Sequence, residues 1–196
     1  MTPGGPAPRG ELVPLDRIEP WDRLIEAFPQ KRVFHEAVWL RFIASEQGGS
    51  PCVLRWSEPR SLADGLWAGV GVRKGPLRIF GSPLRGWGTV AMGPLYHGSD
   101  PPGLIAAAES TLRNEGIRHW EFVSETLGTS PEEKKHYRFE SSDTHRIALN
   151  AEEEVMWAGL QQRCRTAIRK AAKNGLAAQR STDPAFLDSF YALVAA

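Results

Sequence analysis

Cysteine is scarce in this chain, and long apolar runs are missing. The 196 residues include two cysteines, Cys52 and Cys164, which lie far apart and form no Cys-x-x-Cys pair. This usage is typical of free thiols in a reducing cytoplasm, so we expect a cytoplasmic protein without a disulfide framework. No run of about 18 apolar residues occurs, so no transmembrane helix is predicted. Residues 1–11, MTPGGPAPRGE, lack an apolar core and predict a flexible tail rather than a secretory signal.

An excess of charge of one sign is also missing. The chain has 24 Lys and Arg against 23 Asp and Glu, a formal net charge of +1. A general nucleic-acid coat protein is strongly basic, so any anion site here must be a local patch, and DNA is not an expected partner. The five histidines show no His-x-His or His-x-x-x-His spacing, and no zinc site is predicted.

The residues that are present suffice for a core. Hydrophobic residues make up 41 % of the chain, which includes 7 Trp and 8 Phe. The length predicts one domain, or one and a fraction. Helical and strand patterns alternate along the chain, which indicates the α/β or α+β class with a mixed sheet.

Local patterns predict the elements. Apolar residues at helical spacing follow Pro20 as far as Phe28, and a second helix is expected from about Glu36 to Glu46. Strands are predicted over 51–58 and 65–75, and residues 77–96 are expected to form short strands joined by tight turns. A helix over 101–115 is predicted to end at Gly116, followed by a strand over 118–125 and a short polar helix within 128–137. One or two strands are expected within 137–150.

The most unusual segment is LQQRCRTAIRKAAKNGL, residues 160–176, which contains no acidic residue. We expect one long helix from Ala151 to Asn174, with Asn150 as the N-cap, Glu153 completing a capping box and Gly175 as the C′ residue. Its basic side chains are Arg163, Arg165, Arg169, Lys170 and Lys173. The predicted apolar seam consists of Trp157, Leu160, Cys164, Ile168 and Ala171.

Two interpretations of this basic helix stay open. Cations near a helix C-terminus each contribute roughly 0.3–1 kcal/mol through the helix dipole, so a solvated charged face needs no ligand. Like charges four residues apart, however, cost a few tenths of a kcal/mol per pair. A helix selected for stability alone would include acidic residues, which favours a phosphate-bearing partner.

Four segments together resemble a known family. They are EPWDRLIEAFPQKRVFHEAVWLRFI, RIFGSPLRGWGTVAMGPL, EEVMWAGLQQRCRTAIRKAAKNGLAAQ and DPAFLDSFYALV. From about residue 12 onward, the chain is similar to the FemAB-like and BioF2-like acyltransferases. The resemblance implies GNAT-like domains in tandem, each a mixed twisted sheet with flanking helices. Residues 12–150 would be the N-terminal GNAT-like domain, and residues 151–196 the basic helix and an incomplete second one.

The resemblance also implies an activity. Members of the family transfer an acyl or aminoacyl group to an amine, in cell-wall or cell-surface polymer biosynthesis. The donor would be acyl-CoA or aminoacyl-tRNA, with no tightly bound cofactor. The chain stops within a helical pattern, so we expect a fragment in which Phe186 and Phe190 form an exposed apolar patch.

Two sets of site residues follow. The phosphate of a small molecule, a cell-wall precursor or tRNA would contact Arg163, Arg165, Arg169, Lys170 and Lys173. An acceptor groove would include Arg85, Trp87 and Tyr96. A catalytic base could be Glu121, Glu125 or Asp143, and the sequence does not choose among them.

A working CoA loop is not expected. Residues 66–71 and 83–88 have glycines at nearly the right spacing, but neither segment is followed by a helix, so both are predicted to be bulged or turning strands. Cys164 is predicted to be a packing residue. Two alternatives to an enzyme remain, a non-catalytic substrate-binding module of the same fold and an RNA-binding domain that uses the basic helix. Thioester-dependent turnover would distinguish the enzyme from both.

Overall fold

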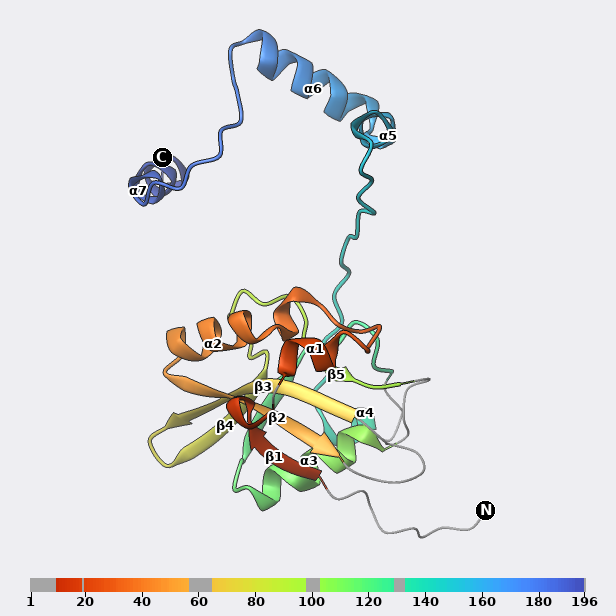
Figure 1. Ribbon diagram of the computed structural model, residues 1–196, viewed down its shortest axis with the longest axis vertical. Helices are drawn as coiled ribbons and strands as arrows, with labels where there is room; N and C mark the ends of the chain where they lie inside the picture. Colours follow the sequence, from red (N-terminus) through yellow and green to blue (C-terminus); the bar gives the residue numbers. More distant parts are fainter. Residues whose placement is uncertain (1–9, 19, 57–64, 98–102, 129–132, 196) are drawn as a thin grey trace. The chain divides into compact units, whose positions relative to one another are not determined.

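The computed structural model describes residues 10–18, 20–56, 65–97, 103–128 and 133–195 (Figure 1). The chain divides into two compact units, Met1–Phe139 and Glu140–Ala196. The first nine residues of the expected tail lie outside the described residues, whereas residues 10 and 11 already belong to a strand.

The first unit is built on a mixed, open sheet. Its strands are β1 (Gly10–Pro14), β2 (Gly49–Trp56), β3 (Gly65–Lys74), β4 (Leu77–Ser82), β5 (Pro94–Leu95) and β6 (His119–Phe122). The main path runs β1-β2-β3-β4-β6, and β5 pairs with β3. The β4–β6 pair is parallel and the other pairs are antiparallel. A parallel pair requires a crossover connection, and here that connection contains α3 (Leu104–Asn114).

Helices cover both faces of the sheet. Figure 1 shows α1 (Trp21–Ile25) and α2 (Ala37–Glu46) on one face and α3 on the other. Two short 3₁₀ helices, Leu15–Arg17 and Val33–His35, precede α1 and α2. Because side chains alternate along a strand, Leu66 and Ala68 of β3 pack with the α1 residues while Trp67 packs with the α3 residues. The expected class, mixed α/β with flanking helices, is confirmed.

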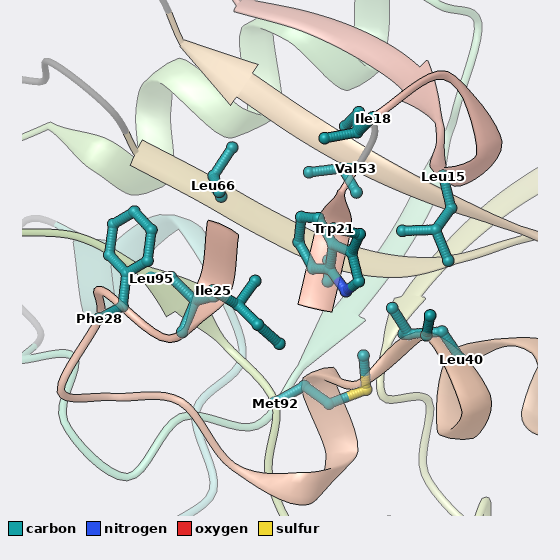
Figure 2. Packing of buried hydrophobic residues seen from close by; sticks show 12 residues of the cluster. Leu15, Ile18, Trp21, Ile25, Phe28, Leu40, Val53, Leu66, Met92 and Leu95 are labelled. Atoms are coloured by element: carbon teal, nitrogen blue, oxygen red, sulfur yellow. The ribbon is translucent and has the colours of Figure 1, made fainter. Parts of the chain in front are cut away.

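The core consists of apolar clusters on the two faces. Figure 2 shows Trp21 in the middle of the first cluster, with Val53 from the sheet and Leu40 from α2 nearby. The second cluster joins Trp67 and Phe80 of the sheet to Leu104 and other residues of α3. Burying one such large side chain contributes about 1.5–3 kcal/mol, so these clusters hold the sheet between its helices.

Several predicted boundaries are close to the observed ones. The second helix, expected from about Glu36 to Glu46, is α2 at Ala37–Glu46. The helix expected over 101–115 is α3, and Gly116 follows it with φ 73° in the left-handed region. The first helix ends at Ile25, earlier than the pattern indicates, although Phe28 is still buried.

The strands expected within 137–150 are not formed. After the short helix α4 (Glu133–His136), no described residue from 137 to 150 belongs to a strand. The last apolar residues of the pattern are exposed, Ile147 by 77 % and Leu149 by 85 %. An alternating pattern yields a strand only where a neighbouring strand supplies hydrogen bonds and an apolar face.

The prediction of a single helix over 151–174 is also wrong. The second unit contains α5 (Glu153–Gly159) and α6 (Gln162–Lys173), and Leu160 and Gln161 between them have extended ψ values of 144° and 148°. Asn150 is not the N-cap, because Glu152 precedes α5. The Asn150 Oδ1 instead accepts the Glu152 N–H at 2.8 Å. A glycine at position 159 weakens helix continuation at this point.

The second unit has no buried residue among those described. Its last helix, α7 (Ala185–Val194), leaves Phe186 and Phe190 exposed by 49 % and 47 %. The expected exposed apolar patch is therefore confirmed. Within the described part of the chain, every helix is too short or too polar to cross a membrane.

Candidate functional site

A polar cluster lies on strand β6 at one edge of the sheet. Trp120 and Phe122 of β6 pack against Trp67, with ring centroids 5.7 Å and 4.7 Å away. Because neighbouring side chains on a strand point to opposite faces, His119 and Glu121 lie together on the other face. Aromatic packing on one face of β6 therefore fixes the position of the polar pair on the other.

Glu121 is held by two groups. His119 Nε2 lies 3.0 Å from Glu121 Oε1, and the backbone N–H of Arg85 donates to Glu121 Oε2 at 3.0 Å. We call His119, Glu121 and Arg85 the edge cluster. The side chains of His119 and Glu121 are exposed by 50 % and 41 %, so a substrate can reach them.

The surroundings of Glu121 favour its ionised form. The Arg85 N–H, with a smaller contribution from the hydrogen bond to His119, holds the pKa of the Glu121 carboxyl below its usual value. Glu121 is therefore a carboxylate at neutral pH, and it orients the imidazole ring beside it. An exposed imidazole held by a carboxylate can accept or release a proton.

The predicted acceptor groove is brought together only in part. Gly81 of β4 pairs with Glu121, and a Cβ at position 81 would lie 2.8 Å from the Trp87 ring. Arg85 thus contacts Glu121, and Trp87 lies over Gly81, the residue that pairs with it. Tyr96, by contrast, is 6 % exposed in the apolar cluster on the α3 face, because β5 pairs with β3 and takes it into the core.

The other two candidate bases lie elsewhere. Glu125 forms an ion pair with Arg32, with Nε and Oε2 3.2 Å apart. Asp143 is an exposed residue of the second unit, in a segment without helix or strand. Glu121, one of the three carboxylates left open by the sequence, contacts a histidine.

The segments that resemble a CoA loop are parts of the sheet and its turns. Residues 66–71 lie inside β3, and residues 83–88 form a turn after β4 that no helix follows. The prediction of a strand is therefore confirmed for residues 66–71, whereas residues 83–88 form a turn rather than a strand.

The basic helix α6 divides its cations into two groups. Arg165 Nη1 donates to the carbonyl oxygens of Ala158 at 3.0 Å and Leu160 at 2.6 Å, and Arg169 lies 5.4 Å from the Trp157 ring centroid. These two arginines hold the turn between α5 and α6. Arg163, Lys170 and Lys173 make no ion pair or cation–π contact with the described residues. The five phosphate contacts stay a prediction.

The two cysteines differ in environment. Cys52 is buried, and burial raises its pKa to about 12, so it is an unreactive thiol. Cys164 is exposed, and so is Ile168 of the same predicted seam, so the predicted packing role of Cys164 is wrong. The described residues contain no group of three His, Cys, Asp or Glu side chains suited to a metal ion.

Comparisons with family models, with curated proteins and with solved structures give no match for this chain. Sequence reasoning overlooked His119 as a site residue. The signal was the His-x-Glu spacing within a predicted strand, since a spacing of two places both side chains on one face.

Proposed function

We propose that this protein is an N-acyltransferase that transfers an acyl or aminoacyl group to an amine. The observation that carries the proposal is the edge cluster, an ionised carboxylate with an exposed imidazole at the edge of a mixed sheet. Acyl transfer to an amine needs a proton acceptor next to an open surface, and this cluster provides one.

The position of the cluster in the fold supports the proposal. In open α/β sheets, ligands bind near the carboxyl ends of parallel strands. Strands β4 and β6 are parallel. His119 is the first residue of β6, and the cluster reaches the carboxyl ends through Glu121, which accepts the Arg85 N–H from the segment after β4. A mixed sheet with helices on both faces is also the architecture expected of a GNAT-like domain, which the family resemblance implies.

Catalysis would consist mainly of positioning. The enzyme would hold the acceptor amine against the activated carbonyl of the donor, and the amine proton would leave through a nearby base. Helix α6 of the second unit would bind a phosphate-bearing molecule. Arg163, Lys170 and Lys173 are the best contacts, since they make no ion pair with the described residues.

The test is a transfer assay on the full chain. Acetyl-CoA and an aminoacyl-tRNA are offered separately as donors, with a nucleoside-diphosphate-linked muramyl peptide that carries a free amine as acceptor. With one of the two donors, we expect mass spectrometry to show that the mass of the acceptor has increased by that of the acyl or aminoacyl group. Without a donor, the mass of the acceptor should not change. No mass gain with either donor contradicts the proposal.

The same material tests the binding-only alternatives. A separate basic helix with five cations and no acid is the observation that favours them. Binding of the muramyl nucleotide without turnover would indicate a substrate-binding module. Binding of tRNA that weakens steeply with salt, again without turnover, would indicate an RNA-binding domain.

A further inference from the structure

One nitrogen of the His119 ring has a partner among the described residues and the other has none there. His119 Nε2 lies 3.0 Å from Glu121 Oε1, whereas no described residue bonds to Nδ1. Because Glu121 is ionised, the neutral ring keeps its proton on Nε2 and donates it to the carboxylate. The lone pair of Nδ1 then remains available on a half-exposed side chain.

We infer that His119 is the general base that takes the proton from the attacking amine, and that Glu121 is the positioning residue that holds the ring in its basic tautomer. The inference rests on the proposed function and names the base that the sequence left open. The expected nucleophile is a primary amine in its neutral form.

The reaction balances with these groups. The amine nitrogen attacks the carbonyl carbon of a thioester or ester donor, and a C–N bond forms. The nitrogen of the resulting tetrahedral species is positively charged, and His119 Nδ1 accepts one of its protons. The C–S or C–O bond then breaks, and the leaving thiolate or alkoxide takes up the proton from His119.

The architecture around the pair is suited to this role. His119 and Glu121 lie on a strand that is fixed by the contacts of Trp120 and Phe122 with Trp67, so the imidazole and the carboxylate keep their spacing. The Arg85 N–H occupies Glu121 Oε2 and leaves Oε1 for the imidazole. A base whose orientation is set by a third group is the usual arrangement in acyl-transfer enzymes.

The first test measures the reactivity of His119 without any acyl donor or acceptor. Diethyl pyrocarbonate acylates neutral imidazole, and mass spectrometry locates each modified histidine. We expect His119 to react at least about threefold faster than the exposed His145 in the same protein, because the hydrogen bond to Glu121 keeps the ring proton on Nε2 and leaves the Nδ1 lone pair on a half-exposed side chain. Glu121→Gln should abolish this difference, and Glu46→Gln, an exposed glutamate on α2, should leave it unchanged.

The second test measures transfer. His119→Gln should lower kcat/KM by about 100-fold or more, the usual contribution of a general base. Glu121→Gln should lower kcat by about tenfold and leave KM nearly unchanged. His145→Gln is the matched control, because His145 is exposed in a segment without regular structure. Circular dichroism establishes that each variant is folded.

The outcomes separate the base from the function. If the transfer rate of His119→Gln lies within twofold of the wild-type rate, the role of His119 is overturned and the acyltransferase proposal stands. The wild type could fail to transfer any acyl group while His119 still reacts faster with diethyl pyrocarbonate than His145, and only when Glu121 is present. That result overturns the proposed function but supports the activated histidine. Equal reactivity of His119 and His145 shows an ordinary surface ion pair and overturns the inference.

Discussion

His35 is a buried histidine that joins two loops through hydrogen bonds. Its Nδ1 accepts the Arg32 N–H at 3.0 Å, and its Nε2 lies 3.4 Å from the Gly93 carbonyl oxygen, to which it donates. The side chain is 0 % exposed, and burial is the main cause that lowers its pKa. The ring is therefore neutral in the folded protein, and both of its nitrogens are used.

This arrangement predicts a loss of stability in mild acid. The pKa of His35 is lowered on folding, so the unfolded chain binds more protons below its ordinary pKa of about 6.5. The free energy of unfolding should fall as the pH decreases from about 6.5 towards the folded pKa, and this contribution levels off below it. His35→Asn should be less stable at pH 7.5 and lose less stability between pH 7.5 and 5. Urea denaturation at both values measures this, and an unchanged difference contradicts it.

Two glycines of β3 allow a matched test of packing. A Cβ at position 69 would lie 2.5 Å from Phe80 Cζ and 2.6 Å from the Gly81 carbonyl oxygen, whereas one at position 71 meets Cys52 Sγ at 3.6 Å. Gly69→Ala should therefore destabilise the protein by about 1–3 kcal/mol. Gly71→Ala should stay within about 0.5 kcal/mol of the wild type. Equal effects in urea denaturation would show that Phe80 moves aside freely.

At the scale of elements, Arg165 holds the end of α5. Besides its bonds to Ala158 and Leu160, its Nη2 donates to Gln162 Oε1 at 2.9 Å. The last carbonyl groups of a helix have no partner within that helix, and here a guanidinium supplies one. Arg165 thus stabilises the turn that separates α5 from α6.

Removing this guanidinium should loosen α5. Arg165→Gln should speed amide hydrogen exchange across 153–160 by about fivefold, the equivalent of about 1 kcal/mol for the lost bonds. Arg163→Gln is the control, because Arg163 is on the same helix and makes no contact with α5 among the described residues. Exchange followed by mass spectrometry measures both variants. The same acceleration in both would assign the effect to the charge of α6 rather than to capping.

Lys170 and Lys173 of α6 allow phosphate binding to be tested apart from the capping role of Arg165. Lys170→Gln combined with Lys173→Gln changes residues that make no ion pair with the described residues, so it leaves the α5–α6 turn intact. This variant should bind the muramyl nucleotide at least about tenfold more weakly at low salt, measured by calorimetry. Arg180→Gln, outside α6 in the same unit, should bind as the wild type does. Equal weakening by both would indicate a general charge effect.

At the scale of the whole molecule, the two units differ in burial. Among the described residues, each buried side chain belongs to the first unit, and those of the second are exposed or half-buried. Because apolar burial is the dominant source of stability, amides of β2, β3 and α3 should exchange slowly and those of 153–194 quickly. Hydrogen exchange on the full chain checks this. Protection of α6 equal to that of β3 would contradict it.

Local patterns predicted the elements whose signals lie within a few residues. Helix α2 follows from apolar spacing and the glycines after it, and Gly116 marks the end of α3 because it adopts a left-handed φ. The break between α5 and α6 was not predictable in this way, because Arg165 reaches back to carbonyl groups in the preceding helix. Within the edge cluster, Arg85 meets Glu121 across 36 residues of sequence, and no local signal reports such a contact.

The sequence by itself determined the mixed α/β class, the positions of α2 and α3, and the basic face of α6, because periodicity and composition act over short distances. Only the tertiary structure decided that Glu121 lies beside the Arg85 N–H and that Tyr96 is buried. These outcomes depend on strand pairing, since the β4–β6 register places Glu121 beside Gly81 and the β3–β5 pair directs Tyr96 into the core. Pairing joins residues far apart in the chain, so no single segment contains the information.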